Sequence, residues 1–217
     1  MHSILVDKVD RITCINLDKR PERWTKCKQE FAKVGLADCV ERFSGIEVTP
    51  GIAGCSLSHY NVIKQAKIDG CKSVLVFEDD VEFLRTDNFN TIITDAFQQM
   101  ESSNIEYDMF YLGGNVKGVD NSKIDANLVE LNSVKCAHAY IITDTVYDVI
   151  IDIIEQGNIN DNWSCNSQNY DRLNLDYRYY RDISPNYNVY GVWPMLAKQA
   201  EGYSDVNGGF HDYKLDG

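Results

Sequence analysis

Residues 73–81 read SVLVFEDDV, and this short stretch decides how the chain folds. The segment SVLVF is mostly apolar and predicts a buried strand, which three acids end abruptly. Adjacent carboxylates repel one another unless a positive charge lies beside them, and Mg²⁺ or Mn²⁺ prefers carboxylate and phosphate oxygens. On an extended chain Glu78 and Asp80 share a side and Asp79 points away. Taken alone, the stretch is equally consistent with a cation site and with an acidic corner that faces solvent.

Strand-like and helix-like segments alternate around this stretch. Strands are expected at residues 12–17, 39–43, 108–112, 138–142 and 189–193, and helices at residues 21–34, 55–69, 90–100 and 144–155. This alternation predicts an α/β sandwich in a single domain, with a central, mostly parallel sheet flanked by helices. In such sheets ligands bind beyond the carboxyl ends of the strands, where the acids lie. Residues 157–185 show no clear period.

Composition and charge restrict the classes of partner. The 217 residues carry a net charge of -12, which argues against nonspecific binding of nucleic acid or of an anionic membrane surface. No window approaches the ~20 apolar residues of a transmembrane helix, and the first residues do not resemble a signal peptide. The seven cysteines form no CxxC motif, which favours free thiols in a reducing compartment. We therefore expect a soluble, cytoplasmic protein, and leave a peripheral association with a membrane open.

Three segments together resemble one family. They read INLDKRPER at residues 15–23, GIAGCSLSH at residues 51–59 and VFEDDV at residues 76–81. In this order and spacing they are similar to glycosyltransferase family 25, which includes bacterial lipooligosaccharide galactosyltransferases and collagen hydroxylysine galactosyltransferases. Weaker matches follow at residues 111–113 and 137–140 and near the distal end, so that the resemblance covers nearly the whole chain.

The resemblance implies a GT-A fold and an inverting transfer of a hexose from a UDP-sugar to a hydroxyl. Galactose is the expected sugar and glucose the next, and the acceptor is a glycan, a glycolipid or a collagen-like chain. The acidic triplet corresponds to the metal-binding motif, so that Asp80, with Glu78, would hold Mn²⁺ or Mg²⁺ against the donor diphosphate. Glu78 or Asp79 would hold ribose or the donor sugar. A late histidine, His211, is the candidate third metal ligand, and a disordered tail is the alternative for that segment.

The donor is expected to bind to residues of about 1–115, and the acceptor to residues of about 116–217. Eleven residues are candidates for contact with the donor: Asn16, Leu17, Arg20, Arg23, Ser58, His59, Glu78, Asp79, Gly113, Gly114 and His138. All of them except Leu17 have a structural alternative. The arginines are also typical solvated charges at a helix start, the two histidines typical core residues, and the two glycines a typical turn.

An inverting transferase needs a carboxylate that takes the proton of the acceptor hydroxyl. Asp161 is the first candidate because Trp163, which suits stacking on a sugar ring, follows it; Asp171 and Asp205 are the alternatives. The chain also departs from the family, since Ile52 stands where the family usually carries an acid. Tyrosines at 170, 177, 179 and 180 favour a carbohydrate acceptor or a subunit interface.

Other classes of function are less well supported. A catalytically silent carbohydrate- or protein-binding module on the same fold is the main alternative, motivated by Ile52 and by the unmatched residues 157–185. A metal-dependent phosphohydrolase would carry a DxDGT-like nucleophile motif, and none occurs. A dinucleotide-binding oxidoreductase would show GxGxxG after the first strand, and the chain has none there.

Overall fold

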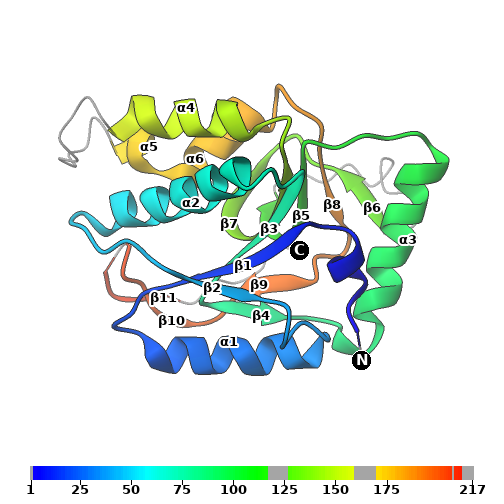
Figure 1. Ribbon diagram of the computed structural model, residues 1–217, viewed down its shortest axis with the longest axis horizontal. Helices are drawn as coiled ribbons and strands as arrows, with labels where there is room; N and C mark the ends of the chain where they lie inside the picture. The colour runs from blue at the N-terminus through cyan, green and yellow to red at the C-terminus, as the bar shows by residue number, and fades with distance from the viewer. Residues whose placement is uncertain (1, 117–126, 159–169, 207, 212–217) are drawn as a thin grey trace.

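A seven-stranded sheet in the order β2-β1-β3-β7-β5-β8-β6 forms the centre of the computed structural model (Figure 1), which describes residues 2–116, 127–158, 170–206 and 208–211. Its strands are β1 (Arg11–Asn16), β2 (Glu41–Ser44), β3 (Ser73–Glu78), β5 (Met109–Val116), β6 (Leu128–Glu130), β7 (Val134–Thr143) and β8 (Val189–Val192). The pairings show that five of the seven run in one direction, while β7 and β6 run against their neighbours. The predicted mostly parallel sheet is confirmed.

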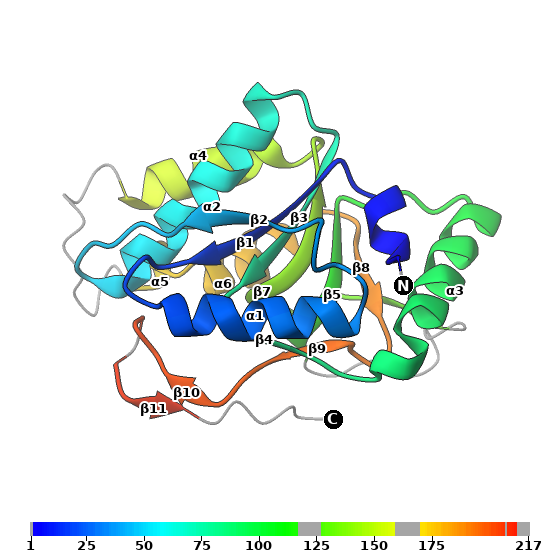
Figure 2. The same ribbon diagram turned by 60° about the horizontal axis from the view of Figure 1, so that its bottom comes forward.

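Helices cover both faces of the sheet. They are α1 (Pro21–Lys33), α2 (Gly51–Ile68), α3 (Phe89–Ser102) and α4 (Tyr147–Asn158), with the one-turn helices α5 (Tyr170–Leu173) and α6 (Leu175–Arg178) and a π-helical turn at Tyr179–Ile183. Short 3-10 helices lie at Ile4–Asp7 and Thr86–Asn88. α2 and α4 lie on one face and α1 and α3 on the other (Figures 1 and 2). This arrangement confirms the α/β sandwich.

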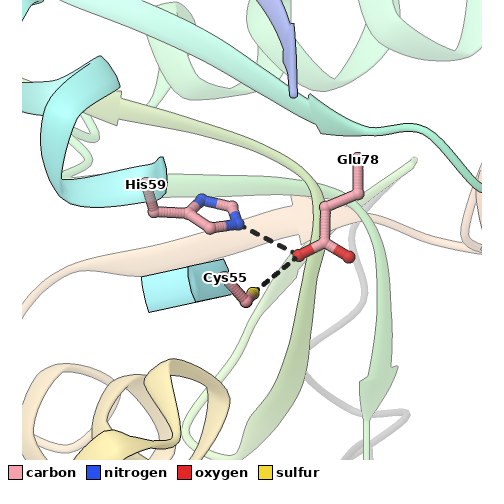
Figure 3. A group of neighbouring side chains, drawn as sticks. All are labelled: Cys55, His59 and Glu78. Carbon is pink, nitrogen blue, oxygen red and sulfur yellow. Dashed lines mark hydrogen bonds and ion pairs between the residues drawn. The ribbon is translucent and has the colours of Figure 1, made fainter. Parts of the chain in front are cut away.

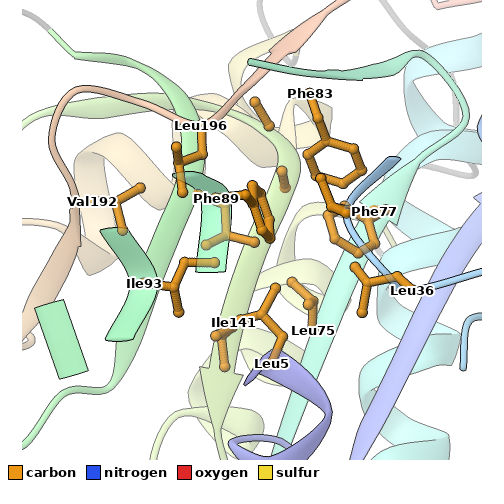
Figure 4. Close-up of a cluster of buried hydrophobic side chains, with 14 of the residues drawn as sticks. Leu5, Leu36, Leu75, Phe77, Phe83, Phe89, Ile93, Ile141, Val192 and Leu196 are labelled. Carbon is orange, nitrogen blue, oxygen red and sulfur yellow. The ribbon is translucent and has the colours of Figure 1, made fainter. Parts of the chain in front are cut away.

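The apolar run of β3 is explained by burial on both of its sides. Leu75 and Phe77 join a core with α1 and α3 that contains Phe89 (Figure 4). Val74 and Val76 face the second core, against α2 and α4. A strand covered on both faces needs apolar residues at every position, so SVLVF shows no alternation.

Several element boundaries differ from those predicted. α2 begins at Gly51, four residues before the expected start, because Pro50 stands at the N-cap in an extended conformation and Ile52 is buried. β7 starts at Val134 rather than at residue 138. The unpatterned residues 157–185 contain α5, α6 and the π-helical turn, which are too short to show a helical period.

A return segment, residues 197–206, brings the end of the chain back to the acids. Its strand β9 (Ala197–Gln199) pairs with β4 (Val81–Phe83), which follows the acids directly, and β10 (Gly202–Tyr203) pairs with β11 (Phe210–His211). The amide of Ala200 donates to the carbonyl of Asp80 at 2.7 Å. Figure 2 shows these strands on the α1 side of the molecule.

Two further expectations concern thiols and membranes. The six cysteines within the described ranges are all free. Among the helices of the described part of the chain, none combines the length and the apolar character that crossing a bilayer requires.

Candidate active site

A cavity of about 350 Å³ opens where the carboxyl ends of β1 and β3 meet. The two strands run parallel, with Ile15 opposite Glu78, so their ends lie at one edge of the sheet. The first turns of α2, the one-turn helix α6 and the return segment form the other walls. The acids of residues 78–80 therefore lie in a pocket at the strand ends, where the sheet topology predicts ligand binding.

The three acids have different surroundings. The Oε1 atom of Glu78 lies 3.0 Å from His59 Nε2 and 3.6 Å from Cys55 Sγ (Figure 3). Asp79 turns to the corner between β1 and α1, where it accepts from Asn16 Nδ2 at 2.7 Å and pairs with Arg23 Nη1 at 2.8 Å. Among the described residues, a full positive charge pairs with Asp79 and with neither of the other two acids.

Asp80 is the least satisfied of the acids. Its Oδ2 accepts from Gln199 Nε2 at 3.3 Å, but its Oδ1 is buried and has no hydrogen-bond partner among the described residues. Burial raises the pKa of Asp80 well above its usual range, and the neighbouring Glu78 and Asp79 add to the shift. A buried carboxylate oxygen without a partner is costly unless a cation or a proton meets it. Asp80 therefore fits a divalent cation with oxygen ligands.

A fourth acid, Asp176, lines the same cavity and was not predicted from the sequence. It lies in α6, whose first turn is capped by Asn174 Oδ1, which accepts from the Tyr177 amide at 3.3 Å. Burial and then the charge of Glu78 raise the pKa of Asp176 to about 7. Burial, and then the charge of Asp79, raise the pKa of Glu78 to about 7 as well. The cavity thus gathers acids with little positive charge to balance them.

The predicted base candidates take different places. Asp161, like Trp163, lies outside the described residues. Asp171 is exposed on α5 and is not among the described residues that line the cavity. Asp205 lines the cavity but is held by Arg20 through two hydrogen bonds, at 3.0 and 2.9 Å. The unpatterned segment does supply a carboxylate to the cavity, at position 176 rather than 171.

The polar residues at the end of β1 form hydrogen bonds mainly with one another and with their neighbours. Asn16 is buried, donates to Asp79 and to the Arg20 carbonyl, and accepts from Arg42 Nε at 2.8 Å. Arg23 contacts Asp79 and the carbonyl of Tyr203. Leu17 and Arg23 line the cavity. This corner therefore offers a ligand an apolar surface and two cationic side chains, Lys19 and Arg23.

His59 and Ser58 come to the cavity from α2. His59 is fully buried, and burial lowers the pKa of its imidazole to about 4, so the ring is neutral. Its Nδ1 lies 2.8 Å from the Tyr140 hydroxyl. Ser58 donates to the Gly54 carbonyl at 2.7 Å and accepts from the Ile46 amide at 2.8 Å, which fixes the loop before α2. Helical spacing predicted the face of α2 that carries His59, and Ser58 reaches the cavity from the first half of the same helix.

The remaining predicted residues lie elsewhere. Gly113, Gly114 and His138 belong to β5 and β7 and are not part of the described cavity lining. A Cβ atom on Gly113 would overlap the Ala197 carbonyl and lie 2.6 Å from His138 Nε2. Gly113 therefore allows β9 of the same chain to approach the backbone closely. His211 pairs through its backbone in β11, and its side chain lies outside the described part.

Comparisons with known proteins agree with the motif pattern. A family model described as "Glycosyltransferase family 25 (LPS biosynthesis protein)" matches residues 38–162, more than half of the chain. A human protein named "Inactive glycosyltransferase 25 family member 3" is 38% identical over 71 residues, 33% of this chain and 12% of that protein. "Procollagen galactosyltransferase 1" of Danio rerio is 34% identical over 71 residues, 33% of this chain and 11% of that protein.

A Drosophila pseudoobscura protein named "Glycosyltransferase 25 family member" is 29% identical over 134 residues, 48% of this chain and 20% of that protein. The matches thus span between 11% and 20% of these relatives' lengths. Among solved structures, one titled "Crystal structure of a glycosyltransferase involved in the glycosylation of the major capsid of PBCV-1" aligns with a TM-score of 0.48 at 15% identity, over 80% of this chain and 74% of that chain.

Proposed function

Because this chain belongs to glycosyltransferase family 25, we propose that it transfers a hexose, galactose or glucose, from a UDP-sugar to an acceptor hydroxyl, with inversion and with Mn²⁺ or Mg²⁺ bound. The acceptor is a glycan, a glycolipid or a collagen-like chain. The observation that carries the proposal is the buried, unpartnered Oδ1 of Asp80 in an acid-lined cavity at the strand ends. A cation bound there would meet both this oxygen and the diphosphate of the donor.

Asp80 would hold the cation through Oδ1. When bound, the cation stabilises the negative charge that grows on the leaving diphosphate, which favours the transition state over the ground state. Asp79 keeps its own cation, Arg23, and is fixed by Asn16, so it orients this corner rather than competing for the metal. Arg23 and Lys19 both line the cavity and are the cations that would meet a donor phosphate.

Leu17 and Ile15 give the same wall an apolar surface on which the nucleoside of the donor would pack. The second half of the chain also lines the cavity, with Cys136, Asn174 and Asp176 and with the return segment. We assign the donor to the part near residues 1–115 and the acceptor to the part after them.

Asp176 is our candidate for the base, in place of Asp161 and Asp171. It lines the cavity, and a pKa of about 7 suits a carboxylate that gains and loses a proton near neutral pH. As the acceptor oxygen bonds to the anomeric carbon, its proton passes to the Asp176 carboxylate. The bond from that carbon to the phosphate oxygen breaks at the same time, and its electron pair leaves with UDP.

The experiment measures nucleotide release from a panel of UDP-, GDP- and CMP-sugars, with Mn²⁺ and with chelator. We expect UDP release from one sugar, only with metal, and a loss of at least ~100-fold in Asp80→Asn. Asp87→Asn is the matched control, since Asp87 is an exposed acid before α3. Equal activity of Asp80→Asn and the wild type would remove Asp80 from the site.

A second candidate is a catalytically silent carbohydrate- or protein-binding module. Two observations favour it: Ile52 puts an apolar side chain on the cavity where the family usually has an acid, and the human relative is named inactive. The two functions differ in the same assay. A protein that neither releases UDP nor binds it in a thermal-shift titration is the silent module, and UDP binding without turnover indicates a missing acceptor.

A further inference from the structure

Cys55, His59 and Glu78 meet on the inner wall of the cavity (Figure 3). Cys55 and His59 lie four residues apart in α2 and so share one face of the helix. Both point at the carboxylate of Glu78 at the end of β3. One ligand atom from each of the three lies within 4.8 Å of the others.

The distances suit a single bound cation. Tetrahedral zinc holds nitrogen and oxygen at about 2.0–2.2 Å and sulfur at about 2.3 Å, which places its ligand atoms roughly 3.3–3.6 Å from one another. Here His59 Nε2 lies 3.0 Å and Cys55 Sγ 3.6 Å from Glu78 Oε1. The third pair, Cys55 Sγ and His59 Nε2, lies within 4.8 Å, so an ion would draw these two side chains toward each other while Glu78 stays close to its present distance from both.

The surroundings of His59 are those of a metal ligand. A metal-binding histidine usually donates its second ring N–H to a fixed acceptor, which orients the ring and sets the tautomer. The Tyr140 hydroxyl lies 2.8 Å from His59 Nδ1 and is itself 3.2 Å from the Tyr179 hydroxyl. With the proton on Nδ1, the lone pair of Nε2 faces Glu78 and Cys55.

We propose that Cys55, His59 and Glu78 form a second cation site, for a thiophilic divalent cation of the zinc class, apart from the oxygen-ligand site at Asp80. One thiolate and one imidazole select zinc over Mn²⁺ and Mg²⁺. Binding releases the thiol proton to solvent, and the fourth position faces the cavity. The inference goes beyond glycosyl transfer and does not require it.

The test uses the chelator-stripped full chain, titrated with Co²⁺ as an optical probe and then with Zn²⁺. We expect one equivalent of Co²⁺ to produce a thiolate-to-cobalt charge-transfer band in the near ultraviolet, which Zn²⁺ then abolishes. Cys55→Ser should remove this band and weaken Zn²⁺ binding at least ~10-fold. Cys136→Ser is the matched control. Cys136 lines the same cavity but lies outside the group of Cys55, His59 and Glu78, so this variant should keep both the charge-transfer band and the Zn²⁺ affinity.

His59→Gln is the second variant, and thermal unfolding of each metal-free variant shows whether it is folded. Weaker Zn²⁺ binding in folded His59→Gln supports the proposal, even if Cys55→Ser does not fold. A thiolate band that persists in Cys55→Ser overturns it. The proposal is also overturned if Asp80→Asn abolishes Zn²⁺ binding while Cys55→Ser leaves it intact, because zinc would then bind at the donor-metal site. UDP release with Mn²⁺, measured in parallel, separates failure of this inference from failure of the proposed function.

Discussion

Arg20 and Asp205 lie 185 positions apart in the sequence and form a two-pronged ion pair. Arg20 Nε donates to one carboxylate oxygen at 3.0 Å, and Nη2 to the other at 2.9 Å. The guanidinium also lies 5.5 Å from the centre of the Tyr203 ring. This ion pair holds the return segment against the corner between β1 and α1 and so closes one wall of the cavity.

The first prediction is that Asp205→Asn loosens the return segment with little loss of stability. A partly exposed ion pair contributes only about 1 kcal/mol or less to the free energy of unfolding, so the fold should survive. Backbone amides of residues 200–206 should exchange with deuterium several-fold faster, because the side chain that holds them is lost. Hydrogen exchange with mass spectrometry measures both the segment and the rest of the chain.

Lys72→Met is the control for this measurement. Lys72 pairs with Asp144 at 2.6 Å on the exposed surface between β3 and α4, far along the chain from the return segment. Its loss should leave exchange at residues 200–206 unchanged. Unaltered exchange in Asp205→Asn would show that the pairing of β9 with β4 holds the segment without Arg20.

The second prediction concerns the base. Asp176→Asn should reduce the rate of transfer to acceptor by roughly 100- to 10,000-fold, the range of general-base catalysis. Binding of UDP should stay within a few-fold of the wild type, because we propose that other residues of the cavity bind the donor. Steady-state kinetics together with a UDP titration separate the two effects. An equal loss of UDP affinity would make Asp176 part of the donor site instead.

The third prediction is a pH dependence of stability in the metal-free protein. Burial raises the pKa of Asp176 to about 7 in the folded chain, above the ordinary value of 3.8. The folded state therefore holds this proton more tightly, and stability falls as pH rises from about 4 through about 7. Asn cannot titrate, so the stability of Asp176→Asn relative to the wild type should increase between pH 5 and pH 8.

Urea unfolding in chelator at these two pH values measures that difference. The buried histidines, whose pKa values burial lowers to about 4, give the opposite slope, since the unfolded state then binds more protons below about pH 6.5. His138 contributes equally in both proteins, whereas the charge of Asp176 raises the pKa of His59, so that the contribution of His59 differs between them but is confined to pH values below about 6.5. If the free energies of unfolding of Asp176→Asn and the wild type differed by the same amount at pH 5 and at pH 8, this would contradict a raised pKa at Asp176.

The fourth prediction is that Mn²⁺ stabilises the wild type and not Asp80→Asn. A cation that binds only the folded state raises the midpoint of thermal unfolding, by an amount that grows with its concentration. Asp80 is expected to supply the decisive ligand atom, its buried Oδ1. In chelator, Asp80→Asn should be at least as stable as the wild type, because burial no longer opposes a charge there. A shift of equal size in both proteins would place the Mn²⁺ elsewhere.

Part of this architecture could be predicted from the sequence for physical reasons. The run SVLVF is mostly apolar, which predicted a buried strand, and sheet topology indicated that the acids after it lie at its carboxyl end; the structure shows that both sides of the strand are covered. His59 and Cys55 followed from helical spacing on α2. These inferences needed only local pattern and general sheet topology.

Other parts could not be predicted because they depend on contacts between distant segments. The reversed direction of β7 follows from how the second half of the chain returns to the sheet, and no local signal marks it. Asp176 lies in a four-residue helix, too short for a period to show. The pairing of Arg20 with Asp205 depends on where β9 ends, which the sequence does not reveal.

The last prediction tests the packing of β9 behind the cavity. Gly113→Ala should destabilise the fold by about 1–3 kcal/mol or more, because overpacked side chains force backbone shifts. The added Cβ would overlap the Ala197 carbonyl and lie 2.6 Å from His138 Nε2, and neither the strand nor a buried ring can move freely. Gly202→Ala is the matched control, since a Cβ there meets nothing within 4 Å. Urea unfolding should separate the two variants. If Gly113→Ala were as stable as Gly202→Ala, β9 would have to pack more loosely against β5 than these contacts indicate, and the placement of Gln199 beside Asp80 would need to be revised.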